Sequence, residues 1–362
     1  MAEEQYIFRP ETKRKIFITL AVGIILSITG IFTSMNSGHG DGHGEGGKEG
    51  HGEEHAMLET SEDMTASSVV MVAEDGGDHA DAGHGHGGHH GSPVWLKRLF
   101  TNLWINNIYF VGLAIIGVFF VAIQYAAQAG WSVGMLRIPT AMASWLLIGG
   151  VLTFGLWWLV KGDVFHWTHS DLYIEGGENF DKIIDGKKGF FFWPLTDSPS
   201  LPVFYLVRMV AFFGIWWFLF KQIKKQMFAE DLEADTKYWY KARKLSTIFL
   251  VIFGFSSSVA AWDWVMSIDT HWFSTMFGWY TFASWWVTGL AFITLMVAVL
   301  KQRGYLKIVN ENHIHDIGKF VFGFSIFWTY IWFSQFLLIY YANIPEETVY
   351  FDQRWHVSNY SW

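Results

Sequence analysis

Apolar residues gather in long uninterrupted runs along this chain, separated by shorter polar segments. Each run is about 20 residues long, the length at which an α-helix crosses the hydrocarbon core of a bilayer. Backbone groups in lipid must be hydrogen-bonded within their own segment, so every run is expected to be a helix. Seven spans are predicted, at residues 16–35, 104–127, 137–160, 201–220, 245–266, 275–300 and 317–342. The pattern therefore predicts an all-α, polytopic transmembrane helical bundle.

The first run has a basic start, as a signal peptide does, with Arg9, Lys13, Arg14 and Lys15 before it. The segment around Met35 is a poor small-residue cleavage site, so the run is interpreted as a retained anchor. Lys and Arg accumulate on the cytoplasmic side of short loops, and they are densest between residues 221 and 244. This predicts a cytoplasmic N-terminus in a multi-pass protein, with residues 161–200, the segment after residue 266 and the C-terminal tail on the outer side.

Composition agrees with a membrane protein and narrows its chemistry. Apolar residues make up 51% of the chain and charged residues 16%, against about 25% charged residues in soluble domains. The chain contains no cysteine, which excludes disulfides and iron–sulfur clusters held by this chain. Any iron–sulfur cluster must therefore belong to another subunit. Phospholipids are expected around the chain, and no nucleic-acid partner is expected.

Residues 37–92 form a separate block, rich in glycine, histidine and acidic residues. The block has too little apolar surface to offset the entropy of ordering it, so a mobile outer loop is expected. Imidazoles at this density can bind a transition metal, which makes weak metal ligands of His84, His86, His89 and His90. A solvated linker without a dedicated metal site is the favoured alternative.

A carboxylate near hydrocarbon costs several kcal/mol unless it is paired or hydrated, and Asp263 lies between tryptophans at the outer end of the fifth span. With a rise of about 1.5 Å per residue, Asp263 lies roughly 5 Å and Arg208 roughly 10 Å below the outer ends of their spans. An antiparallel pair of helices would bring the two charges together. Two interpretations stay open: a structural ion pair, or a proton-accepting site in which Arg208 tunes the proton affinity of Asp263.

Other ionisable residues lie in the outer segments, namely His166, His169, Asp269 and His271. Histidine accepts protons near neutral pH, and a quinol must release two protons when it is oxidised. This placement indicates quinol oxidation at the outer face. The rival is a bis-histidine haem, but the middles of the spans hold essentially no histidine, so no integral haem b is expected.

Polar residues inside the spans are candidates for a proton path. They are Asn106, Asn107, Gln124, Ser257, Lys319, Tyr330 and Gln335. Such residues also hold transmembrane helices together through hydrogen bonds, each contributing on the order of 1 kcal/mol.

Three stretches resemble a known family: Trp262–Phe277, with the sequence WDWVMSIDTHWFSTMF, the preceding Tyr240–Arg243, and the later Tyr340–Thr348. They are similar to the F subunits of bacterial alternative complex III, which are NrfD/polysulfide-reductase-type membrane proteins. The resemblance covers most of residues 100–350.

This resemblance implies a subunit of a quinol:cytochrome c oxidoreductase in the bacterial inner membrane. The implied partners are a second NrfD-like subunit, an iron–sulfur subunit, multihaem cytochromes c and a terminal oxidase. Haem c and iron–sulfur clusters would lie in those partners, and a quinone such as menaquinone would be the only cofactor near this chain. In that family a companion C subunit is the better supported site of quinol oxidation, and the F subunit serves proton movement or coupling.

The family also implies a domain plan built from two four-helix bundles. Residues 1–36 would be the cytoplasmic segment and first anchor, 37–98 the outer loop, 99–266 the first bundle, and 267–362 the start of the second. The family has further spans beyond the seven visible here, so we expect either a partial chain or a second bundle completed elsewhere.

The sequence thus predicts a membrane subunit that binds quinone, conducts protons, or does both. The alternative is a structural anchor that docks soluble redox subunits through residues 161–200. A proton- or metal-coupled transporter would use the same embedded charges.

Overall fold

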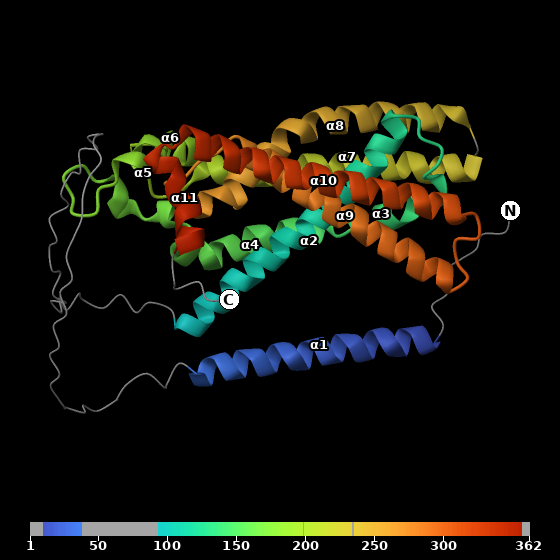
Figure 1. Cartoon of the computed structure of the whole chain (residues 1–362), viewed down its shortest axis with the longest axis horizontal. Helices are drawn as coiled ribbons and strands as arrows, with labels where there is room; N and C mark the ends of the chain where they lie inside the picture. Colours follow the sequence, from blue (N-terminus) through green and yellow to red (C-terminus); the bar gives the residue numbers. More distant parts are fainter. Residues whose placement is uncertain (1–9, 38–92, 198, 234, 357–362) are drawn as a thin grey trace, which may run out of the picture. The chain divides into compact units, whose positions relative to one another are not determined.

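The computed structural model describes residues 10–37, 93–197, 199–233 and 235–356. Within these residues every regular element is helical, either α or 3₁₀ (Figure 1). Seven helices or helix pairs are long and apolar enough to cross a membrane. The protein is therefore a polytopic helical membrane protein, which confirms the fold predicted from the apolar runs.

The first transmembrane helix, α1 (Pro10–Ser37), belongs to a unit of its own that ends at Leu96. Its apolar side chains are exposed along the whole described length, including Ile16, Leu20 and Ile24. An apolar helix of this length suits a membrane span.

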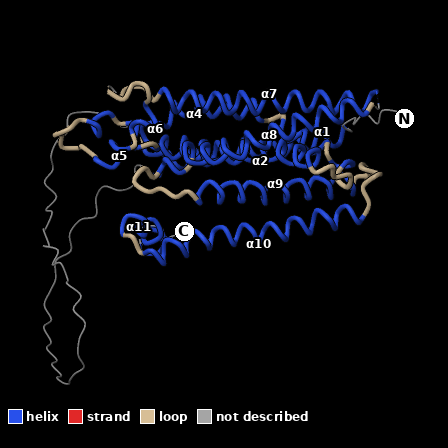
Figure 2. Tube along the Cα trace, turned by 90° about the horizontal axis from the view of Figure 1, so that it is seen from above, coloured by secondary structure: helices blue, strands red, loops and turns tan. Residues whose placement is uncertain are grey.

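The other helices form the second unit, residues 97–362. At its centre lies α2 (Val94–Ala126), the most buried span. The long helices around it are α7 (Val203–Glu233), α8 (Thr236–Trp264), α9 (Met276–Gln302) and α10 (Glu311–Ala342). In sequence order α7 packs on α8, α8 on α9 and α9 on α10 (Figure 2).

The third span is continuous in the sequence pattern but is divided in the structure. It consists of α3 (Arg137–Ala143) and α4 (Leu146–Val164). At the junction the backbone N–H groups of Ser144 and Trp145 donate to the carbonyls three residues earlier, at 3.1 Å each. Bonds to the third preceding residue are typical of a 3₁₀ helix, so the helix is more tightly wound at this junction.

Glycine allows α2 and α9 to approach closely. A Cβ added to Gly289 would lie 2.3 Å from Ile116, and one added to Gly112 would lie 2.4 Å from Trp285. Small residues are common where transmembrane helices touch. The hydrophobic effect does not drive helices together in lipid, so close van der Waals packing must stabilise the contact.

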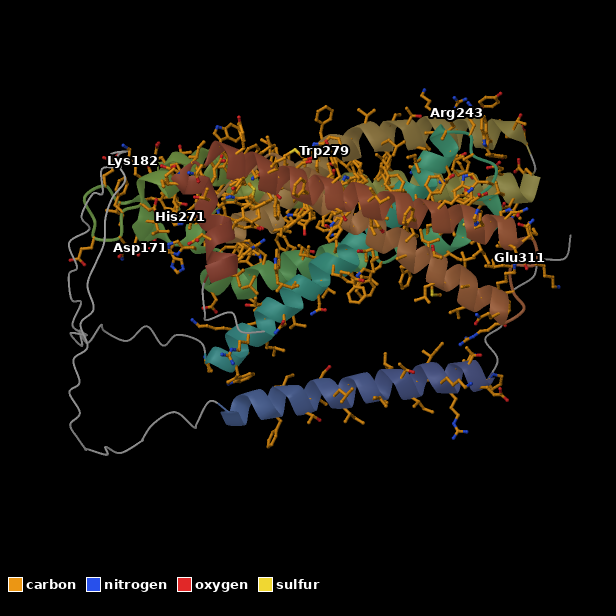
Figure 3. All side chains as sticks on the ribbon, in the orientation of Figure 1. Asp171, Lys182, Arg243, His271, Trp279 and Glu311 are labelled. Carbon is orange, nitrogen blue, oxygen red and sulfur yellow. The ribbon has the colours of Figure 1, made fainter. Side chains whose placement is uncertain are left out.

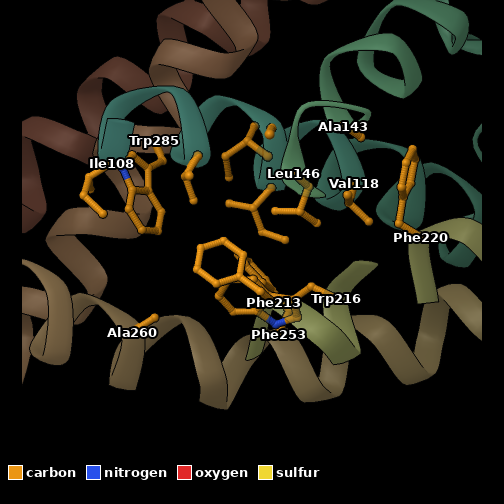
Figure 4. Packing of buried hydrophobic residues seen from close by; sticks show 14 of the residues in the cluster. Ile108, Val118, Ala143, Leu146, Phe213, Trp216, Phe220, Phe253, Ala260 and Trp285 are labelled. Carbon is orange, nitrogen blue, oxygen red and sulfur yellow. The ribbon is translucent and has the colours of Figure 1, made fainter. Parts of the chain in front are cut away.

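Aromatic side chains fill the core between α2, α7 and α8 (Figure 4). Phe213 stacks on Trp264 with ring centroids 4.9 Å apart, and Trp216 contacts Phe253 edge to face. The indole N–H of Trp216 donates to Ser256 at 2.9 Å. Aromatic side chains thus fill the space between these helices in the middle of the bundle.

Residues 165–197 fold back onto the end of the bundle where α7 begins, as their aromatic density predicts. This end is called here the outer end, after the side that the sequence predicts for it. The folded-back residues contain 3₁₀ turns at His166–Thr168 and Ser170–Tyr173 and the short helices α5 (Lys182–Gly186) and α6 (Lys188–Phe192). Trp167 and Phe191 stack with centroids 4.0 Å apart. Because α6 packs on α7, this segment is part of the folded unit.

The boundaries proposed for the outer loop and the two bundles stay predictions. Most of the His-rich block, including all four weak metal-ligand candidates, lies outside the described residues.

Candidate functional site at the outer end

The site begins with an ion pair between α7 and α8. Arg208 Nε donates to Asp263 Oδ2 and Arg208 Nη2 donates to Asp263 Oδ1, both at 2.8 Å. The carboxylate is fully buried and the guanidinium side chain is 9% exposed. The structure therefore brings together the two charges that the sequence analysis expected to meet, in the bidentate geometry that suits arginine and carboxylate.

The third nitrogen of the Arg208 guanidinium connects this ion pair to α6. Arg208 Nη1 donates to the carbonyl of Phe190 at 2.8 Å. The rings of Phe190 and Phe204 lie over the guanidinium, with centroids 4.2 and 4.3 Å from its central carbon. Asp263 is held as well: its backbone carbonyl accepts a hydrogen bond from the hydroxyl of Ser267. The ion pair thus fixes α6 and the end of α8 to the bundle.

Beside the ion pair lies a cavity of about 380 Å³, called here the outer cavity. Its walls are mostly apolar and come from α6, the end of α8 and the segment before α9. The lining residues are Gly186, Lys187, Phe190, Phe191, Trp262, Met266, Ser267, Asp269, Thr270, Trp272, Phe273, Ser274 and Thr275. Arg208 and Asp263 are not in this lining, but Phe190 and Ser267 touch both the cavity and the pair.

Two residues that line the outer cavity have a buried hydrogen-bond donor without a partner. The indole N–H groups of Trp262 and Trp272 are buried and have no partner among the described residues. The ammonium of Lys187 donates to the carbonyl of Thr270. Burial lowers the pKa of Lys187, and the nearby carboxylates of Asp269 and Asp181 offset this only in part. A ligand with oxygen acceptors would satisfy donors that are otherwise unpaired in an apolar setting.

Ionisable side chains gather on the solvent side of this region. The Nε2 atom of His271 lies 2.5 Å from Asp181 Oδ2, and the His271 ring lies 6.3 Å from that of His166. The ring of His169 lies 5.8 Å from that of His166. Figure 3 shows His271 at the same end of the bundle as Asp171 and Lys182, with Arg243 and Glu311 at the opposite end. The structure therefore groups the three histidines that the sequence placed on the outer side.

Asp181 has a second role, as the N-cap of α5. Its Oδ1 atom accepts from the backbone N–H groups of Ile183 and Ile184, at 2.9 and 3.0 Å. Burial raises the pKa of Asp181, but the hydrogen bond and charge of His271 and these two N–H groups together bring it below its usual value. The carboxylate is therefore held in its charged form between α5 and the segment that follows α8.

The polar residues proposed for a proton path are not brought into one file. Asn106 is exposed and donates to Asn102, whereas Asn107 is buried and donates to Thr153 at 2.8 Å. Lys319 pairs with Asp316 on the exposed face of α10.

The other proposed path residues are equally dispersed. Ser257 is buried in α8, Tyr330 is 62% exposed on α10, and Gln124 lines a different cavity at the other end of the bundle. Only Gln335 reaches the outer cavity, because its amide donates at 3.0 Å to Ser274, one of the lining residues.

Sequence reasoning missed several residues of this site. Lys187, Trp262 and Trp272 line the cavity, and Asp181 pairs with His271, yet no helix period or charged run marks them. Local signals existed for Asp181, since aspartate at the start of a short helix is a preferred N-cap, and for Trp262 and Trp272, which lie in the quoted Trp262–Phe277 motif. Among the described residues no group of three or more acidic or histidine side chains is arranged to hold a metal ion.

The site and fold define a class, a polytopic helical membrane protein with a ligand-sized cavity at one end. Comparison at the level of sequence goes no further: no family model matches the chain, and no curated protein matches it. Membership of a particular family therefore stays a prediction from the motifs.

Proposed function

We propose that this chain is a membrane subunit of a respiratory quinol-oxidising complex, and that the outer cavity takes the quinone ring. The observation that carries the proposal is the combination of apolar walls, unpaired indole N–H donors and an adjacent buried ion pair. A quinone is an apolar ring with two carbonyl acceptors, so it complements these walls and donors.

The chemistry assigned to the cavity is proton release during quinol oxidation. A quinol that becomes a quinone loses two protons and two electrons. The electrons must go to cofactors in partner subunits, because a chain without cysteine holds no iron–sulfur cluster. Haem c and iron–sulfur subunits, a second NrfD-like subunit and a terminal oxidase are the partners that the sequence motifs favour, with menaquinone as the quinone.

Asp269 is the first proton acceptor in this proposal. It lines the cavity and is only partly buried, whereas both oxygens of Asp263 are already bound by Arg208. From Asp269 protons would pass to His271 and Asp181, which lie in the exposed histidine group. Arg208 and Asp263 are positioning residues: Arg208 binds the carbonyl of Phe190 and so holds this part of the cavity wall in place.

Orientation and location belong to the same proposal. Basic residues between α7 and α8 favour a cytoplasmic position for that end of the bundle, and so an outer position for the cavity. The proton release site would then face the outer side of a bacterial inner membrane.

The test is quinone binding in the assembled complex purified with Trp272→Phe. Loss of the indole donor should raise the KM for quinol by about tenfold, the factor for one buried hydrogen bond, with little change in the amount of complex. Trp279→Phe is the matched control, because Trp279 is 56% exposed and lies outside the cavity. Equal KM values for both variants and the unmodified complex would remove the cavity from quinone binding.

A structural anchor is the second candidate, favoured by apolar side chains exposed on the outer segment. Ile174 is 59% exposed and Ile183 is 50% exposed, beyond the membrane-spanning helices. If docking of soluble subunits is the main role, Ile183→Asp should release those subunits from the membrane, while Trp272→Phe leaves turnover unchanged. Both substitutions in parallel separate the two functions.

A further inference from the structure

The opposite end of the bundle contains a second cavity of about 200 Å³, called here the inner cavity. It lies between the end of α2, the start of α3 and the end of α7. Glu230 is 27 residues beyond Val203, the first residue of α7, which places it about 40 Å along the helix. The hydrocarbon core of a bilayer is about 30 Å thick, so a position about 40 Å along the helix lies beyond it, at the depth of the lipid headgroups.

Gln124 and Glu230 bring two hydrogen-bond acceptors to the lining of the inner cavity. The side-chain amide oxygen of Gln124 is buried without a partner among the described residues, and Gln124 as a whole is 9% exposed. Glu230 also lines the cavity and accepts from the hydroxyl of Tyr125 at 3.0 Å. In the described part of the chain no cation is paired with Glu230. An amide oxygen without a partner and a carboxylate without an ion-pair partner, lining one cavity, suit a cationic N–H donor.

One cation, Arg137, lies at another side of the same cavity. Arg137 lines the cavity and forms an ion pair with Asp231. The ring of Phe228 lies 4.1 Å from the Arg137 guanidinium carbon and 5.8 Å from the ammonium of Lys224. Arg137 provides donors for a phosphate in the cavity, since Asp231 binds only its Nη2 atom, whereas Lys224 lies outside the lining and donates to Ser144.

We propose that the inner cavity binds the headgroup of a phospholipid with a primary ammonium group. The ammonium would bind Glu230 and the amide oxygen of Gln124, and the phosphate would lie toward Arg137. This proposal does not depend on the function assigned to the outer cavity.

Charge and hydrogen-bonding capacity together select this ligand class. An anionic headgroup without an amine would leave the Gln124 oxygen unpaired and bring negative charge toward Glu230. A quaternary choline headgroup would carry the right charge but has no N–H to donate. A phosphatidylethanolamine-type headgroup has the charge, the donors and the phosphate.

Native mass spectrometry of the purified full chain tests the proposal, with phosphatidylethanolamine, phosphatidylcholine and phosphatidylglycerol as separate probes. Phosphatidylethanolamine should bind about tenfold more tightly than phosphatidylcholine, the factor expected for charge-assisted hydrogen bonds. Glu230→Gln should remove that preference and should strengthen, not weaken, phosphatidylglycerol binding, because the carboxylate no longer repels an anionic headgroup. Gln124→Leu, which alters no charge, should also weaken the binding of phosphatidylethanolamine.

Glu233→Gln is the matched control, because Glu233 lies one turn further along α7, outside the inner cavity, and binds Tyr238. It should keep the preference for phosphatidylethanolamine. Equal binding of the ethanolamine and choline lipids, or an unchanged preference in Glu230→Gln, would overturn the proposal. Displacement of the lipid by soluble glycerophosphoethanolamine would assign the cavity to a soluble ligand and would also overturn it.

Discussion

The two ends of the bundle handle charge in opposite ways. At the outer end Arg208 and Asp263 are buried and bind each other, beside a cavity with apolar walls. At the inner end Arg137 and Asp231 are about half exposed, beside a more polar cavity. Burial makes the outer pair sensitive to the loss of either partner, whereas water and headgroups can replace a partner at the inner end.

The largest expected effect comes from removing one partner of the outer pair. Asp263→Ala leaves the Arg208 charge buried and unpaired, which should lower the free energy of unfolding in detergent by about 3–5 kcal/mol. The double variant Arg208→Met/Asp263→Ala should recover most of that loss. Denaturant-induced unfolding of the purified protein measures both.

The matched change at the inner end is Asp231→Ala, which should cost about 1 kcal/mol or less because the pair is exposed. An equal loss at both ends would contradict the comparison.

Next in size is the effect of the cavity carboxylate on turnover. Asp269→Asn removes the proposed first proton acceptor, so quinol oxidation by the assembled complex should slow by about 100-fold, the lower range for general base catalysis. Asp171→Asn changes an exposed aspartate of the same outer region and should leave the rate unaltered. Full activity of the Asp269 variant would exclude this residue as the base.

A smaller effect should follow from acidification of the outer segment. The folded-state pKa of Asp181 is lowered, so its contribution to stability is complete above its unfolded-state pKa and is lost as pH falls through the folded-state value. The protection of the Ile183 and Ile184 amides against hydrogen exchange, measured relative to the intrinsic rate at each pH, should therefore fall below about pH 4, near the ordinary aspartate pKa.

Asp181→Ala should give the same lower protection already at neutral pH, with a loss of about 1 kcal/mol for one helix cap. Exchange in the inner-end helix turns should not change in this variant. Protection of α5 that is independent of both pH and the substitution would show that Asp181 does not hold it.

The smallest effect is expected at an exposed pair on α10. Lys319 and Asp316 are 62% and 40% exposed in their side chains. Lys319→Ala should change the free energy of unfolding by about 0.5 kcal/mol or less, measured alongside Asp263→Ala. A loss comparable to that of the buried pair would mean that Lys319 has a partner beyond Asp316.

Much of the fold could be predicted because a transmembrane span is a local property of the sequence. A run of about 20 apolar residues must be helical in lipid whatever its neighbours are. The meeting of Arg208 with Asp263 was also predictable, since two charges inside successive antiparallel spans have few other partners.

Positions around the helix axis were not predictable in this way. Asn106 and Asn107 are neighbours in the sequence, yet one is exposed and the other is buried against α4. Successive residues of a helix point in directions about 100° apart, so only the packing of α2 against its neighbours decides which of them faces the interior.

The sequence by itself determined the membrane-spanning helices and the exclusion of cysteine-bound cofactors, because these follow from the composition and length of single segments. It also predicted the pairing of Arg208 with Asp263, because two charges in successive antiparallel spans have few other partners. Only the tertiary structure decided that Lys187, Trp262 and Trp272 share a cavity, and that Asp181 binds His271. These residues come from segments up to 90 positions apart, and the fold of the loop onto α7 and α8 brings them together.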